Sequence, residues 1–156
     1  MIAVDSSALI AILRREPEAD NFLQIITDAD GCLLSAVSFL ETSMVLAGRT
    51  GDMTSWTELD ALIARAGIQV VAQDAELAEA ARAAFLVYGR GRHPASLNLG
   101  DCASYALAKH HNLCSCSRAT TFRELTFAPA GGTRARRDRP MPAWHSGRRH
   151  PCGGKR

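Results

Sequence analysis

The chain has 156 residues, which is room for one domain built around one hydrophobic core. Hydrophobic residues make up 47% and charged residues 22%, and no apolar run approaches the roughly 18 residues that a membrane-spanning helix needs. No basic segment precedes an apolar stretch at the N-terminus, so we expect no secretory signal and no membrane association. A cytoplasmic location is the prediction.

The net charge of +2 is divided unevenly along the chain. Residues 1–112 carry 8 Lys/Arg against 14 Asp/Glu, a charge of −6, whereas residues 113–156 carry 10 against 2, a charge of +8. A basic tail is typical of a nucleic-acid-binding arm, which is one hypothesis for residues 118–156. Residues 129–156 are rich in Arg, Gly and Pro and offer little that could build a core. We therefore predict a folded domain over residues 1–128 and a disordered basic tail over 129–156.

Predicted strands and helices alternate from residue 1 to residue 112. Short apolar runs at residues 2–4 and 32–35 and a β-branched run at 68–71 predict three strands, the first of them buried. Capping residues and apolar side chains at helical spacing predict the helices. Their predicted starts, in chain order, are Ser6 or Ser7, Pro17, Ser38, the segment near Trp56, Asp74 and Gly100. This alternation predicts an α/β sandwich around a mostly parallel sheet.

Three carboxylates stand at positions where α/β folds often place their chemistry. Asp5 directly follows the first strand, Glu41 lies near the start of a helix, and Asp101 lies in the first turn of another. Clustered carboxylates repel one another unless a cation joins them, and Mg²⁺ and Mn²⁺ prefer oxygen ligands. A site of this kind binds a phosphate through the metal ion, activates a water molecule and stabilises charge as a phosphodiester breaks.

Each of these acids also has a purely structural explanation. An acid in the first turn of a helix stabilises the helix dipole by ~0.3–1 kcal/mol. That explanation is favoured for Glu41 taken alone, and it is balanced against a functional one for Asp101. Asp5 is harder to explain in this way, because an apolar strand leads straight into it. The spacing alone leaves open whether the three side chains converge.

Three blocks of the sequence resemble PIN domains of VapC-like toxins. The first block is Ile-Ala-Val-Asp-Ser-Ser-Ala-Leu at residues 2–9. The second, residues 34–41, has a Glu after a strand–helix junction, and the third and most specific covers residues 93–108 around Leu-Gly-Asp-Cys. The blocks occur in the order and at the spacing of that family, and together they cover residues 1–112.

The resemblance implies a PIN-like three-layer α/β/α sandwich and a Mg²⁺-dependent endoribonuclease, with Mn²⁺ as the alternative ion. It implies the toxin of a VapBC-type toxin–antitoxin system, homodimeric and neutralised by a cognate VapB-type antitoxin. On this reading Asp5 and Asp101 bind the metal, and Glu41 completes the catalytic set. Ser7 would support Asp5 by a hydrogen bond, although a helix cap explains Ser7 equally well.

The basic loop before Asp101 has two open interpretations. Its residues Arg90, Arg92 and His93 hold the RNA backbone near the site, or they are a solvated basic loop.

The sequence departs from the family pattern after residue 112. The resemblance implies a hydrophobic strand there, then a Lys-Gly-x-Asp-Phe turn with a fourth acid, but residues 113–122 read Leu-Cys-Ser-Cys-Ser-Arg-Ala-Thr-Thr-Phe. Glu124 is the nearest acid, and its context does not match. A shift of the reading frame by one base allows this stretch to encode a hydrophobic run followed by Lys-Gly-Asp-Asp-Phe. Our hypothesis is a frameshift near codon 113, which makes the basic tail an out-of-frame translation.

The departure leaves a second hypothesis for the function. A strand that is normally buried would carry Cys, Ser and Arg, and each unpaired buried polar group costs ~1–3 kcal/mol. Set against a typical stability of ~5–15 kcal/mol, this loss is large. The alternative to a nuclease is therefore a catalytically inactive PIN remnant that binds only antitoxin or RNA.

Overall fold

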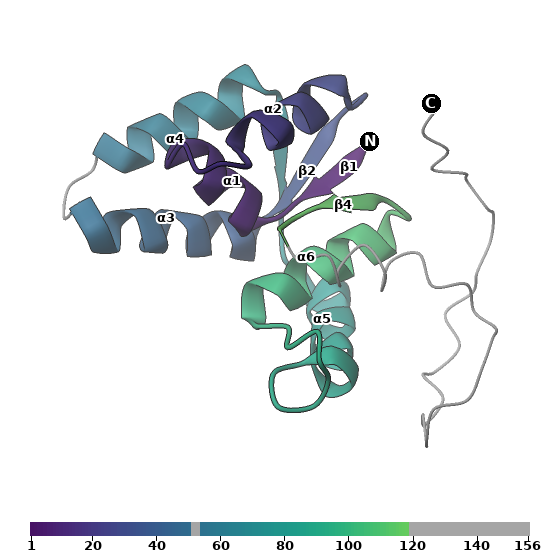
Figure 1. Ribbon diagram of the computed structural model, residues 1–156. Coiled ribbons are helices and arrows are strands. Elements are labelled where there is room, and N and C mark those ends of the chain that lie inside the picture. The colour runs from purple at the N-terminus through teal and green to yellow at the C-terminus, as the bar shows by residue number, and fades with distance from the viewer. Residues whose placement is uncertain (51–53, 119–156) are drawn as a thin grey trace.

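The computed structural model describes residues 1–50 and 54–118 (Figure 1). In this part of the chain, parallel strands form one sheet in the order β3-β2-β1-β4. The strands are β1 (Ile2–Val4), β2 (Cys32–Ser35), β3 (Ile68–Val71) and β4 (Cys114–Cys116). The first three confirm the predicted strands. β4 lies in a stretch where no regular apolar pattern predicted a strand.

Helices cover both faces of this sheet (Figure 1). The helices are α1 (Ser6–Leu13), α2 (Ala19–Asp28), α3 (Ala36–Thr50), α4 (Thr54–Arg65), α5 (Ala75–Tyr88) and α6 (Leu99–His110). Helices α1 to α4 lie on one face, and α5 and α6 lie on the other. This arrangement confirms the predicted three-layer α/β/α sandwich with a parallel sheet.

Two hydrophobic cores result from the alternation of side chains along the strands. Val4 and Leu34 point into the core beneath α1 to α4, together with Leu9 of α1 and Leu59 of α4. Their sequence neighbours Ala3 and Leu33 point the other way, into the core beneath α5 and α6. Burial of the central strands on both faces explains why their sequences are continuously apolar.

The predicted capping residues of α1 and α3 were wrong by one to three residues. Asp5 itself caps α1, because its side chain accepts from the N–H of Ser7. Ser35 Oγ accepts from the N–H of Ser38, so Ser38 lies inside α3 and does not cap it. The physical reason is that β1 and β2 run directly into helices, so the junction residue takes the capping position. Glu41 consequently lies in the second turn of α3, outside a capping box.

Other predictions of local structure are confirmed, with one further shift. Asp74 Oδ1 accepts from the N–H of Leu77 at 2.9 Å and caps α5. Helix α2 begins at Ala19, two residues after the predicted start at Pro17. Within residues 1–50 and 54–118, no helix is long and apolar enough to cross a membrane. The predicted tail, residues 129–156, and the boundary at residue 128 lie outside the described residues.

Strand β4 carries a polar side chain into the core. Ser115 pairs in register with Ala3 of β1 and is buried, and among the described residues its hydroxyl has no hydrogen-bond partner. An unpaired buried hydroxyl costs ~1–3 kcal/mol. The free-energy cost predicted for a polar strand is therefore assigned to Ser115 Oγ.

Replacement of Ser115 by Ala should therefore stabilise the protein. We expect the free energy of unfolding to rise by about 1–3 kcal/mol, because the substitution removes the unpaired hydroxyl and adds no volume. Urea denaturation of the two proteins measures the difference. The matched control is Ser43→Ala, because Ser43 Oγ donates to the carbonyl of Phe39 at 2.9 Å and its loss should bring no gain. An unchanged or lower stability in Ser115→Ala would contradict the prediction.

Candidate active site

Asp5 lies at the carboxyl edge of the sheet, where β1 ends between β2 and β4. The chain moves outward from β1 to β2 and β3, and then returns to the other side of β1 as β4. The edge between β1 and β4 is therefore the point where the strand order reverses, the usual ligand site in open α/β sheets. The N–H of Asp5 donates to the carbonyl of Cys116 at 3.0 Å, which fixes this corner.

Asp5 is buried, with 1% of its surface exposed, and hydrogen-bond donors surround its carboxylate. Its Oδ2 accepts from the N–H of Ser7 at 3.0 Å and from Ser7 Oγ at 2.7 Å. Its Oδ1 accepts from Ser104 Oγ, on α6, at 2.8 Å. The expected hydrogen bond from Ser7 is thus present, and Asp5 both caps α1 and lies at the ligand edge of the sheet.

Glu41 reaches the same region from α3. Ser6 Oγ, in the first turn of α1, donates to Glu41 Oε2 at 2.8 Å. The carboxylate lies against Gly100 at the start of α6, where a Cβ on residue 100 would overlap Glu41 Oε2. The amino end of a helix attracts negative charge, which favours this placement. Gly100 therefore leaves the space that the Glu41 carboxylate fills.

Asp101 completes the acidic group from the first turn of α6. It forms a capping box with Asn98, whose N–H donates to Asp101 Oδ2 at 2.8 Å and whose side chain accepts from the N–H of Asp101 at 2.9 Å. Burial raises the pKa of Asp101 above its ordinary value, and the negative charges of Asp5 and Glu41 raise this pKa further. The backbone hydrogen bond from Asn98 opposes the rise.

The structure therefore brings Asp101 within electrostatic range of both Asp5 and Glu41. Their oxygen chemistry suits a hard divalent cation, and their mutual repulsion is of the kind that such a cation relieves. Across residues 1–50 and 54–118, however, no three His, Cys, Asp or Glu side chains are gathered closely enough to hold a metal ion. The acids are neighbours around a common edge and do not form a closed set of ligands.

The raised pKa of Asp101 predicts how stability depends on pH. The folded protein holds this proton more tightly than the unfolded chain does, so its stabilising effect is complete below pH 3.8 and is lost as the pH rises through the folded pKa. Asp101→Asn removes the charge and keeps an acceptor for the N–H of Asn98. We expect the variant to melt at a higher temperature than the parent at pH 7, with the difference vanishing toward about pH 3.5. Thermal denaturation in EDTA measures this, and equal melting temperatures at pH 7 would contradict it.

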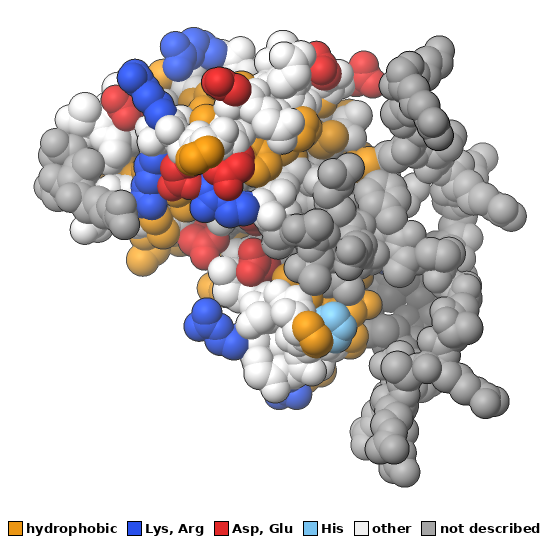
Figure 2. Space-filling model, viewed as in Figure 1, with side chains coloured by type: hydrophobic (Ala, Val, Ile, Leu, Met, Phe, Trp, Pro, Cys, Tyr) orange, Lys and Arg blue, Asp and Glu red, His pale blue; other side chains and the backbone are white. Residues whose placement is uncertain are grey.

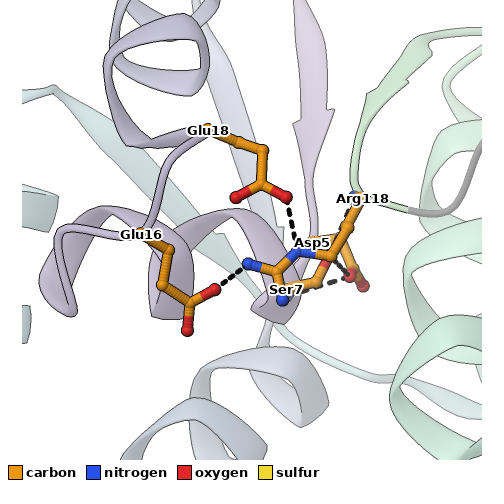
Figure 3. Close-up of polar contacts among 5 residues, drawn as sticks. All are labelled: Asp5, Ser7, Glu16, Glu18 and Arg118. Carbon is orange, nitrogen blue, oxygen red and sulfur yellow. Dashed lines mark hydrogen bonds and ion pairs between the residues drawn. The ribbon is translucent and has the colours of Figure 1, made fainter.

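Arg118 lies beside this site, two residues beyond the end of β4 (Figure 3). Its N–H donates to Ser7 Oγ at 3.0 Å, and its guanidinium pairs with Glu16 and lies 3.7 Å from Glu18. These two acids belong to the connection between α1 and α2. Seen from the same side as Figure 1, Figure 2 shows acidic and basic side chains intermingled over this region. Arg118 thus places a cation within the stretch, residues 113–122, in which the resemblance implies a fourth acid.

Sequence reasoning missed several residues that build the site. Ser6 holds Glu41, Gly100 makes room for it, and Ser104 bonds to Asp5. The available signal was their spacing, because Ser6 and Gly100 adjoin predicted acids and Ser104 follows Asp101 by three residues on a helix. The ion pairs of Arg118 had no such signal, since their partners lie about a hundred residues earlier.

The loop before α6 is closed by its own contacts. The backbone N–H of Arg90 donates to the carbonyl of Leu97, and the N–H of Leu97 donates to the carbonyl of Tyr88. These two bonds join the ends of the loop. His93 Nδ1 accepts from the N–H of Ala95 at 3.0 Å, and its ring packs edge-on against Tyr88. His93 therefore has a structural role in the loop, whereas the side chains of Arg90 and Arg92 are exposed.

These observations define a class of protein. It is an α/β/α domain with several carboxylates at the point where the strand order of a parallel sheet reverses. Comparison with known proteins places the chain within that class. Residues 2–126 match the family model of the PIN domain. The chain is 47% identical over 109 residues to the ribonuclease VapC30 of Mycobacterium tuberculosis, across 69% of this chain and 82% of that protein. This protein therefore belongs to the PIN domain family, in its VapC group.

Other relatives agree with this assignment. The ribonuclease VapC of Mycolicibacterium smegmatis is 46% identical over 108 residues, across 69% of this chain and 83% of that protein. Among solved structures, VapC20 of Mycobacterium tuberculosis, a sarcin–ricin loop cleaving toxin, superposes with a TM-score of 0.63 at 19% identity, over 78% of this chain and 92% of that one. A toxin–antitoxin complex from Klebsiella pneumoniae gives 0.55 at 18% identity, over 83% and 92%. These two structures support the fold.

Proposed function

We propose that this protein is a divalent-metal-dependent endoribonuclease that hydrolyses RNA phosphodiester bonds. The observation that carries the proposal is the position of the three carboxylates: Asp5 lies at the carboxyl edge of the sheet, and Glu41 lies against the start of the helix that carries Asp101. Such a concentration of negative charge is costly without a cation. The similarity to curated VapC ribonucleases supports RNA as the substrate.

Asp5 and Asp101 are the proposed metal ligands, and Glu41 is the third catalytic acid. The bound ion, Mg²⁺ or alternatively Mn²⁺, supplies charge neutralisation and an activated water molecule. The chain's own groups hold the acids in place: Ser7 and Ser104 bond to Asp5, and Ser6 bonds to Glu41. Asn98 holds Asp101 through the capping box. The exposed Arg90 and Arg92 are proposed contacts to the RNA backbone.

The proposed biological role is that of the toxin in a VapBC-type toxin–antitoxin system, acting in the cytoplasm. The partners are a cognate VapB-type antitoxin and a second copy of the chain in a homodimer. Support for the antitoxin comes from the VapC relatives and from the similarity to the toxin–antitoxin complex. The homodimer is expected from the family resemblance.

The direct test is RNA cleavage by the purified full chain with Mg²⁺, with Mn²⁺ and with EDTA. Cleavage that requires a divalent ion and produces internal cuts supports the proposal. Binding of RNA without cleavage at any ion concentration would favour the inactive remnant instead. One observation favours that second function: Arg118, in the stretch where the resemblance implies a fourth acid, brings a cation beside Ser7 and pairs with Glu16.

We also propose that the chain departs from its family frame near codon 113. The unpaired hydroxyl of Ser115 within β4 is what a polar residue in a hydrophobic strand position produces. On this proposal residues 1–112 are the family-like part of the nuclease domain over residues 1–128, and everything after the shift, including the basic tail over 129–156, is an out-of-frame product. Resequencing of the gene is the test. A DNA sequence that lacks the hydrophobic–Lys-Gly-Asp-Asp-Phe reading in the shifted frame would rule the frameshift out.

A further inference from the structure

Three buried serine hydroxyls form a continuous chain that ends on Asp5. Ser35 Oγ, at the end of β2, lies 3.0 Å from Ser38 Oγ of α3. Ser38 Oγ lies 2.8 Å from Ser104 Oγ of α6. Ser104 Oγ donates to Asp5 Oδ1 at 2.8 Å. All three serines are fully buried, so their hydroxyls have no solvent partner.

The direction of each hydrogen bond in this chain follows from a count of donors. A serine hydroxyl carries one hydrogen, whereas an ionised carboxylate only accepts. Ser104 gives its hydrogen to Asp5, so Ser38 is the donor to Ser104. The hydrogen of Ser38 is then engaged, and Ser35 must donate to Ser38.

The chain of hydroxyl groups begins at a backbone N–H group, at the end opposite to Asp5. Ser35 Oγ accepts from the N–H of Ser38 at 3.0 Å, at the amino end of α3. A backbone N–H can only donate, so it takes up a lone pair of Ser35 Oγ and leaves the hydrogen of that hydroxyl for Ser38. Every hydroxyl consequently points its hydrogen toward Asp5.

A count of lone pairs shows which oxygen of Asp5 remains available. A carboxylate has about four acceptor sites, two on each oxygen. The N–H and the hydroxyl of Ser7 occupy both sites of Oδ2, and Ser104 occupies one site of Oδ1. The remaining site lies on Oδ1, the oxygen that the serine chain holds.

We propose that Ser104, itself held by Ser38, is a positioning residue that orients Asp5 Oδ1 toward a divalent cation. This inference rests on the proposed metal-dependent function and names residues beyond its acidic set. It predicts that the cation binds Asp5 through Oδ1. Loss of a group that orients a metal ligand typically weakens metal affinity about 10–100-fold.

Ordinary helix geometry does not account for the two central serines. Hydroxyl groups inside helices commonly donate to the carbonyl four residues earlier. Thr42 and Ser43 of α3 do so, with distances of 2.7 Å to Ser38 and 2.9 Å to Phe39. Ser38 of α3 and Ser104 of α6, which are 66 positions apart in sequence, instead bond to each other. Capping of α3 explains Ser35 alone.

Calorimetric titration of the full-length chain with MgCl₂ or MnCl₂ tests the proposal. We expect Ser104→Ala to raise the metal dissociation constant by about 10–100-fold and Ser38→Ala to raise it by a smaller factor. The double variant should bind no more weakly than Ser104→Ala, because both substitutions interrupt one chain. Thr42→Val is the matched control, since it removes a buried hydroxyl of α3 that lies outside the chain. Its dissociation constant should stay within about twofold of the parent's.

Crystal structures of the metal-free parent and variants provide the second readout. The Asp5 carboxylate should keep one orientation in the parent and in Thr42→Val, and it should rotate in Ser104→Ala or, if that variant fails to fold, in Ser38→Ala. A parent that binds metal no more tightly than the variants do, with Asp5 unmoved, would overturn the positioning role. A parent that binds no metal would overturn the proposed function, while a rotated Asp5 would still support the positioning role.

Discussion

Asp5→Asn is expected to lower metal-dependent RNA cleavage by about a thousandfold, which corresponds to about 4 kcal/mol of transition-state stabilisation. The fixed N–H of Ser7 requires an acceptor, so the amide oxygen of the substituted side chain should face Ser7. The amide nitrogen then takes the place of Oδ1, where it cannot bind a cation. Ser104 can rotate its hydroxyl to accept from that nitrogen, so the fold should survive. Initial cleavage rates, with melting temperature as a check of folding, measure the effect.

The control for this substitution is Asp74→Asn. Asp74 caps α5 through the N–H of Leu77, and Asn is about as good a cap as Asp. The control makes the same chemical change at a helix start outside the acidic site, so cleavage should remain within about twofold of the parent rate. A folded Asp5→Asn protein that retains metal-dependent cleavage at a similar rate would remove Asp5 from the metal site.

Gly100→Ala is expected to lower cleavage by about 10–100-fold while the protein stays folded. A Cβ at this position would overlap the Glu41 carboxylate, which is the flexible end of a side chain and can therefore swing away. The displaced carboxylate loses its position at the amino end of α6 and its hydrogen bond from Ser6. The substitution should thus lower the cleavage rate by displacing Glu41, with only a small change in the free energy of unfolding. Cleavage rates and urea denaturation, measured on the same preparation, separate the two effects.

Two comparisons make this prediction specific. Glu41→Gln should reduce cleavage by a similar factor, and the double variant should be no slower than the slower single variant, because both changes remove the same group. Gly48→Ala is the matched glycine control, since a Cβ there meets no atom within 4 Å and the residue lies within α3. That control should be stabilised by roughly 0.5–1 kcal/mol with unchanged cleavage. Additive losses in the double variant would show that Gly100 acts independently of Glu41.

Local patterns were sufficient for much of the fold. The apolar runs at residues 2–4 and 32–35 predicted β1 and β2, because strands buried on both faces are continuously apolar. β3 is an edge strand with Gln69 and Val70 exposed, and its β-branched residues predicted it instead. Asp74 predicted the start of α5, because capping is a contact between residues three apart. Asp5 was predicted at the carboxyl edge for a similar reason, since its position depends only on the strand that precedes it.

Strand β4 shows where local reasoning failed. Its sequence, Cys-Ser-Cys, lacks the continuous apolar run that predicted the equally short β1. It forms because β1 offers an unpaired edge and α6 returns the chain beside that edge, so tertiary hydrogen bonds override a weak local preference. The same context buries the hydroxyl of Ser115 without a partner among the described residues.

The sequence by itself thus determined the alternation of strands and helices, the family resemblance and the three acids at its core. Only the tertiary structure decided which distant groups hold those acids. Ser104 reaches Asp5 across 99 positions, and Arg118 reaches Ser7 across 111. Contacts of that separation leave no periodic trace in a sequence, because they depend on how α3, α6 and β4 pack around β1. The sequence predicted Asp5, Glu41 and Asp101 as candidate site residues, and the packing of the helices brought them to the same edge of the sheet.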